Sequence, residues 1–188
     1  MAVAAMERHR FTVEDFERMA EVGLLREGDY ELVDGAVVRM SPRGDRHSAA
    51  ADALNRLLIA AAGDAFRVSA ESVSLPLTTV DMRDPDFIVS RTPLVEKRSR
   101  PSIDDIVLLI EVSDSSLAYD LGEKLERYAA AGVAEYWVVD LPNRVLHVFR
   151  APDRARKRYV RRDVLAPDAS VAPEAAPGLD IAIASIFG

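Results

Sequence analysis

Ile106-Val-Leu-Leu-Ile-Glu-Val112 is the segment that decides the fold of this 188-residue chain. Every residue in it except Glu111 is apolar, as is typical of a strand that is buried on both faces of a sheet. A carboxylate in such a strand is costly unless it is paired or bound to a metal, so Glu111 is the first candidate functional residue. The alternative is that the strand has reached the surface by residue 111 and that Glu111 is hydrated.

The segments around this strand indicate an α/β protein with a mixed, twisted sheet flanked by helices. Thr12 is placed to begin a short helix that Gly23 ends. The pair Asp34-Gly35 is typical of a tight hairpin turn. Further helices are expected over 46–62 and 120–131, and strands or extended segments over 30–33, 36–40, 66–77, 86–89, 135–140, 145–150 and 159–162.

The length favours a single domain over 1–188. Its ends are less regular. We expect a loose N-terminus over 1–10 and a Pro- and Ala-rich C-terminal tail over 166–188, whose last segment, 179–187, docks on the body. A charged segment with two prolines over 91–104 is expected to be a loop.

Composition excludes several functions. With no cysteine, the chain has no disulfides, thiolate nucleophiles or thiolate zinc sites, which fits a cytoplasmic protein. No segment is long and apolar enough to cross a bilayer. The net charge of −7 argues against wholesale nucleic-acid binding, but the basic residues are clustered. The two clusters are Arg154, Arg156, Lys157, Arg158, Arg161 and Arg162, and Lys97, Arg98 and Arg100.

Asp86 is the second candidate. Pro85 restricts the backbone before it, so Asp86 projects from the start of a strand, although a turn aspartate is the simpler interpretation. Two carboxylates at the ends of neighbouring strands repel each other, and a hard cation such as Mg²⁺ removes that conflict. Lys124 is the third candidate, because helical spacing places it on the inward side, between Leu121 and Tyr128. The alternative is a lysine that extends along the helix edge to water.

Together these residues resemble a known family. The motifs in order are Pro85-Asp86, Glu111-Val112-Ser113, Asp120…Lys124…Tyr128 and Gly132-Val-Ala-Glu-Tyr-Trp-Val-Val-Asp140, with Tyr30-Glu31, Asp34-Gly35, Ser41-Pro42 and Arg46-His47 upstream. This set is similar to the Uma2 family of the PD-(D/E)xK nuclease superfamily over about 11–150.

The resemblance implies a restriction-endonuclease-like core with a metal site at strand ends. It matches Asp86 to the first acid and Glu111 to the second, and it implies Mg²⁺ or Mn²⁺ held by both and by the Val112 carbonyl. The superfamily pattern has lysine two residues after the second acid, where this chain has Ser113. The Uma2-like arrangement takes the lysine from the next helix, which is Lys124.

Two further candidates are Glu31 and His47. Related nucleases often take an extra acid from an early element, which points to Glu31, and the alternative is an exposed hairpin glutamate. His47 is in phase with the inward face of its helix and is suited to orient a phosphate or a water. A partly buried structural histidine is the other interpretation. Tyr136 and Trp137 are expected in the core.

Two functions remain open. One is a metal-dependent endonuclease acting on DNA, in which Lys124 stabilises charge on the water or the phosphate. A homodimer is then expected, because cutting both strands requires two active sites of opposite polarity. The other is a catalytically degenerate module that binds nucleic acid or a partner protein. The set of Asp86, Glu111 and Lys124 favours the enzyme, and the acidic net charge favours the module.

Overall fold

The computed structural model describes residues 8–26, 28–70, 73–91 and 102–187. The cluster of Lys97, Arg98 and Arg100 lies outside these residues, as do most of the expected 91–104 loop and the start of the N-terminus. The chain divides into two compact units, Met1–Pro42 with Pro76–Asp84 and Arg43–Leu75 with Pro85–Gly188. We call them the first and second units and describe each by itself, and a single domain over 1–188 stays a prediction.

The first unit is built on a hairpin and a helix. Helix α1 (Val13–Glu21) begins with the predicted cap, in which Thr12 and Asp15 bond to each other's backbone N–H groups. Strands β1 (Tyr30–Val33) and β2 (Ala36–Arg39) pair through a turn in which Asp34 and Gly35 both have positive φ, as the sequence predicts. With β4 (Leu75–Thr78) and the unpredicted β5 (Asp81–Arg83), they form a sheet in the order β2-β1-β5-β4.

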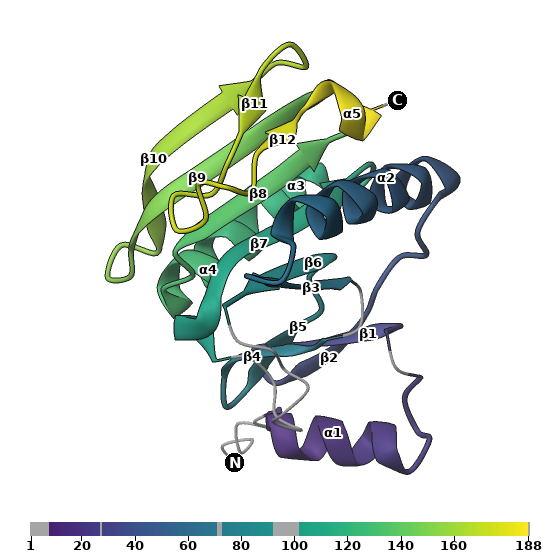
Figure 1. Ribbon diagram of the computed structural model, residues 1–188. Coiled ribbons are helices and arrows are strands. Elements are labelled where there is room, and N and C mark those ends of the chain that lie inside the picture. Colours follow the sequence, from purple (N-terminus) through teal and green to yellow (C-terminus); the bar gives the residue numbers. More distant parts are fainter. Residues whose placement is uncertain (1–7, 27, 71–72, 92–101, 188) are drawn as a thin grey trace, which may run out of the picture. The chain divides into compact units, whose positions relative to one another are not determined.

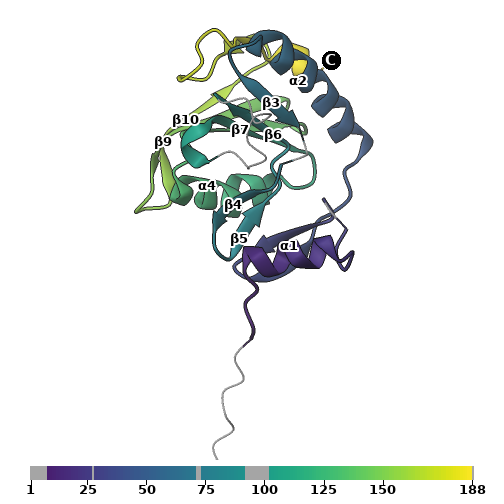
Figure 2. The ribbon, with the colours of Figure 1, turned by 60° about the horizontal axis from the view of Figure 1, so that its bottom comes forward.

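The second unit contains a six-stranded sheet in the order β10-β9-β8-β7-β6-β3. The strands are β3 (Arg67–Ala70), β6 (Phe87–Ser90), β7 (Ile106–Ser113), β8 (Glu135–Asp140), β9 (Val145–Asp153) and β10 (Arg158–Leu165). Strands β7 and β8 are parallel and the other neighbours are antiparallel. Helix α2 (Asp45–Ala62) lies on one face and α4 (Leu125–Ala131) on the other (Figure 1, Figure 2). The predicted mixed sheet flanked by helices is confirmed.

Strand β7 lies in the middle of this sheet, and all its residues are buried. The side chains of Leu108, Ile110 and Val112 join the core that contains Leu54 and Leu58 of α2. Side chains alternate along a strand, so Glu111 belongs to the opposite face, beneath α4. Only 3% of Glu111 is exposed. The alternative of a hydrated glutamate at the surface is therefore wrong.

The helix after β7 differs from the expectation. It begins with a short turn, α3 (Leu117–Tyr119), and continues as a π-helical turn, η2 (Asp120–Lys124), before α4. Residues four apart lie on the same face of a helix. Asp120, Lys124 and Tyr128 are buried together, whereas Leu121, which was expected on the inward side, and Leu125 are only half-buried. Gly132 ends the helix with positive φ.

The C-terminal tail docks on the second unit, as predicted. Strands β11 (Ser170–Val171) and β12 (Ile181–Ala182) pair, and α5 (Ala184–Phe187) contacts α2. Leu179, Ile183 and Ile186 are buried in the main core. Within the described residues, no helix combines the length and apolarity needed to cross a membrane.

Packing of α2 against the sheet is expected to carry much of the stability of the second unit. Leu54 is fully buried in the main core, whereas Ile59 on the same helix is 56% exposed. Leu54→Ala should lower the free energy of unfolding by about 2–5 kcal/mol, because the cavity adds to the lost transfer energy. Ile59→Ala should change it by less than about 0.5 kcal/mol. Urea denaturation of both variants measures the difference, and equal losses would contradict this packing.

Candidate functional site

The two predicted acids meet where β6 begins and β7 ends. Phe87 pairs with Ile110, so continuing this antiparallel register places Asp86 opposite Glu111. Asp86 is 4% exposed, and its Oδ2 accepts the Val112 N–H at 2.7 Å. Like charges opposite each other on neighbouring strands are destabilising, so this arrangement requires compensating positive charge or protons.

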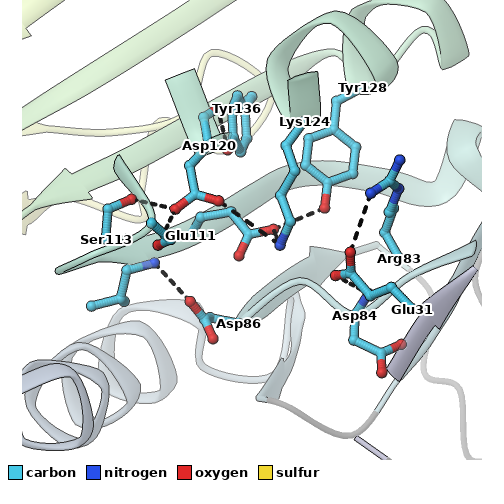
Figure 3. A network of polar contacts seen from close by, with 12 residues as sticks. Glu31, Arg83, Asp84, Asp86, Glu111, Ser113, Asp120, Lys124, Tyr128 and Tyr136 are labelled. Carbon is cyan, nitrogen blue, oxygen red and sulfur yellow. Dashed lines mark hydrogen bonds and ion pairs between the residues drawn. The ribbon is translucent and has the colours of Figure 1, made fainter. Parts of the chain in front are cut away.

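Two hydrogen-bond donors from the helix that covers this face of the sheet compensate the buried negative charge of Glu111. The Lys124 ammonium and the Tyr128 hydroxyl each donate to Glu111 Oε1 at 2.8 Å (Figure 3). Lys124 is only 4% exposed, so the alternative of a lysine extending to water is wrong. Both of these hydrogen bonds go to the same carboxylate oxygen, Oε1.

Asp120 completes the charge arrangement around Lys124. Its Oδ1 lies 3.9 Å from the Lys124 ammonium, and its Oδ2 accepts hydroxyl hydrogen bonds from Ser113 at 2.7 Å and Ser116 at 2.6 Å. Figure 3 shows Asp120 between Ser113 and Lys124. Ser113, at the place where the superfamily pattern has lysine, therefore holds the carboxylate that helps to orient the lysine of this chain.

The buried carboxylates differ in proton affinity. Burial raises the pKa of Glu111 well above its ordinary value, and the nearby charges of Asp86 and Asp120 raise it further against the effect of Lys124. Burial also raises the pKa of Asp120. For Asp86, burial is outweighed by hydrogen bonds from His47 and the Val112 N–H, and the pKa is lowered. The pKa values of the two opposed acids are thus shifted in opposite directions.

Two cationic or titratable side chains approach Asp86 from α2 and the residues before it. His47 Nε2 lies 3.1 Å from Asp86 Oδ2, and the buried His47 Nδ1 has no hydrogen-bond partner among the described residues. Arg43 Nη2 lies 3.4 Å from Asp86 Oδ1. The structure places His47 in contact with the first acid, and whether it also orients a phosphate or a water stays a prediction.

Glu31 belongs to the first unit. It is 2% exposed, so the alternative of an exposed hairpin glutamate is wrong. It accepts hydrogen bonds from the buried Arg83 guanidinium at 3.2 Å and from the Asp84 N–H at 3.3 Å. Its role as an extra catalytic acid stays a prediction. Tyr136 and Trp137 are fully buried, as predicted.

Three residues of the site were not among the sequence-based candidates. Asp120 and Tyr128 lie four residues on either side of Lys124, which is the spacing of one helix face, so a signal was present. Arg43 left no such signal, because it contacts Asp86 from a segment far away in the sequence.

The oxygens available for a cation are few. Among the residues that the structure describes, no group of three or more His, Asp or Glu side chains is arranged to hold a metal ion. The Val112 carbonyl is a further donor. It points to the same side as the Val112 N–H that bonds Asp86, and the register places Pro85 opposite, which has no N–H to donate. Two carboxylates and a carbonyl suit Mg²⁺, which keeps several waters or phosphate oxygens.

Comparison with known proteins supplies the family. The Uma2 family, described as putative restriction endonuclease, matches residues 13–184. A solved structure from Anabaena variabilis, described as a putative nuclease belonging to DUF820, has a TM-score of 0.71 and 18% identity, covering 94% of this chain and 97% of that chain. The type IIG restriction endonuclease BpuSI has a TM-score of 0.35 and 16% identity over 55% of this chain and 11% of that chain, too low to carry an argument.

No curated protein matches the chain. The first of the two solved structures shares the fold along nearly the whole length, and the restriction-endonuclease-like core expected from the sequence is confirmed. Because the family match covers most of the sequence, the chain belongs to the Uma2 family.

Proposed function

We propose that this chain is a divalent-metal-dependent endonuclease that hydrolyses phosphodiester bonds in DNA. The observation that carries the proposal is the meeting of Asp86, Glu111 and Lys124 at the ends of two neighbouring buried strands. Membership of the Uma2 family supports a nuclease in general terms. The complete set of acids and lysine favours catalysis over the alternative of a module that only binds nucleic acid.

Asp86 Oδ1, Glu111 Oε2 and the Val112 carbonyl are the donors we assign to the cation. In each carboxylate the other oxygen is already held: Asp86 Oδ2 by His47 and the Val112 N–H, and Glu111 Oε1 by Lys124 and Tyr128. These bonds fix the orientation of both carboxylates, as hydrogen bonds from surrounding residues do for metal ligands in general. A bound Mg²⁺ or Mn²⁺ polarises the phosphate and lowers the pKa of a coordinated water.

Lys124 acts on the charge that develops during hydrolysis. Its ammonium is buried between Glu111 and Asp120, where the low dielectric strengthens its interaction with an attacking hydroxide or a phosphate oxygen. Asp120 is a positioning residue in this scheme, because it contacts Lys124 and is itself fixed by two serine hydroxyls.

Metal binding is expected to depend on both acids. At a concentration of about 100 Kd, Mg²⁺ or Mn²⁺ should stabilise the native chain by about 2.7 kcal/mol, which raises Tm by roughly 5–10 °C for a protein of this size. Asp86→Asn and Glu111→Gln should each abolish the rise. Glu135→Gln alters a buried glutamate at the start of β8, outside the proposed site, and should keep the metal-induced rise in Tm. Thermal unfolding with and without metal measures this rise in Tm. If the rise persists in Asp86→Asn or Glu111→Gln, the substituted residue is not a metal ligand.

Lys124 is expected to matter for chemistry. In the presence of metal, Lys124→Met should reduce cleavage of plasmid DNA by roughly 10²-fold or more, the effect of losing one electrostatic stabiliser of a transition state. The metal-induced rise in Tm should survive, because the carboxylates remain. Arg127→Met is the matched control, since Arg127 lies on the same helix and pairs with Glu123 at 3.7 Å. Cleavage at the wild-type rate by Lys124→Met would eliminate this role.

The proposed enzyme is expected to act as a homodimer. Cutting both strands requires two sites of opposite polarity, and a two-fold dimer supplies them. Light scattering coupled to size exclusion should give twice the chain mass of 20.6 kDa. A monomer at the concentrations used for cleavage would contradict double-strand cutting by a dimer and would leave nicking of single strands as the activity.

A further inference from the structure

Arg43 is a cation beside the proposed metal site that the mechanism above does not use. Its Nη2 lies 3.4 Å from Asp86 Oδ1, which is longer than the roughly 2.7–2.9 Å of a charge-assisted hydrogen bond. The Arg43 side chain is 37% exposed, whereas that of Asp86 is 6% exposed. The guanidinium therefore reaches into the site from its solvent side.

The two oxygens of Asp86 have different neighbours. Oδ2 is held by His47 and the Val112 N–H, both of which are buried and fixed by the fold. Oδ1 faces the half-exposed Arg43. A side chain with one end in water can change its partner at small cost, and a backbone N–H in a central strand cannot. Oδ1 is thus the oxygen whose partner is exchangeable.

A divalent cation on Oδ1 repels the Arg43 guanidinium, because both are positive and both need the same oxygen. A displaced guanidinium stays near the metal, since its backbone is fixed just before α2. There it presents a planar fork of N–H donors, which fits phosphate oxygens with two parallel hydrogen bonds. A phosphate of the bound strand is an anion of the shape and charge that this fork fits.

Resting on the proposed function, we propose that Arg43 is a phosphate-positioning residue that exchanges Asp86 for a substrate phosphate when metal and nucleic acid bind. In the metal-free chain it competes with the cation for Asp86. In the complex it holds the strand against the site. Arg43 thereby couples the metal and the substrate, and each favours the binding of the other.

The chain offers a matched control three residues away. Arg46 is 71% exposed and pairs at 2.6 Å with Asp114, which follows β7. It has the same charge and lies in the first turn of α2, but its partner is outside the proposed metal site. Arg43→Gln and Arg46→Gln therefore remove the same charge from neighbouring positions, and only Arg43→Gln removes the competition for Asp86.

The test measures metal and DNA binding separately. In thermal unfolding without DNA, the Mn²⁺ midpoint should fall several-fold in Arg43→Gln and stay unchanged in Arg46→Gln. With Ca²⁺ in place of Mg²⁺, affinity for a short DNA duplex should fall roughly tenfold or more in Arg43→Gln, the loss of a charged hydrogen bond. The slope of log Kd against log salt should become shallower by about 0.9, equivalent to one phosphate contact. Arg43→Lys keeps the charge without the fork and should bind DNA with intermediate affinity.

The outcomes separate this proposal from the proposed function. If the wild type binds metal and cleaves DNA while Arg43→Gln matches Arg46→Gln in Mn²⁺ midpoint, duplex affinity and salt slope, only the role of Arg43 is overturned. If Arg43→Gln lowers the metal-free Tm but leaves duplex affinity and slope unchanged, Arg43 is a structural counterion and the proposal also fails. If the wild type shows no response to any divalent metal, both proposals fail.

Discussion

The Glu111 carboxylate sits near the end of a strand that has no exposed residue, and the rest of the site depends on compensating it. An unpaired buried charge costs several kcal/mol, so donors must reach it from the helix that covers the sheet. Lys124 and Tyr128 provide them, and Lys124 is then a second buried charge that Asp120 balances. Asp120 in turn requires the hydroxyls of Ser113 and Ser116. One buried acid thus accounts for a polar network that extends into the following helix.

Three acids, Asp86, Glu111 and Asp120, are buried in this network. The Lys124 ammonium contacts the buried carboxylates of Glu111 and Asp120, and Asp86 contacts His47 and Arg43. Burial is the main cause of the raised pKa of Glu111, and the charges of Asp86 and Asp120 add to it. Such strongly perturbed carboxyl groups are typical of functional sites, although structural ion pairs also produce them. In the proposed site a cation would take the oxygen of each carboxylate that is not fixed by buried donors, namely Asp86 Oδ1, which faces Arg43, and Glu111 Oε2.

Features encoded locally were predictable from the sequence. The Thr12 cap, the Asp34-Gly35 turn and the apolar run of β7 depend on neighbouring residues, and the structure contains all three. The inward position of Lys124 followed from helical spacing. The π turn at Asp120–Lys124 did not, because it depends on how the helix fits over the sheet. Arg43 was also missed, since its meeting with Asp86 exists only after the chain has folded.

The central claim is that Asp86, Glu111 and the Val112 carbonyl hold one divalent cation. The most direct measurement is the anomalous scattering of Mn²⁺ in crystals of the protein soaked or grown with that ion. The account predicts a single strong peak at about 2.0–2.2 Å from one oxygen of each of the three groups, and its loss in Asp86→Asn crystals. An anomalous peak at another place in the protein, or no peak at saturating Mn²⁺, would contradict this claim.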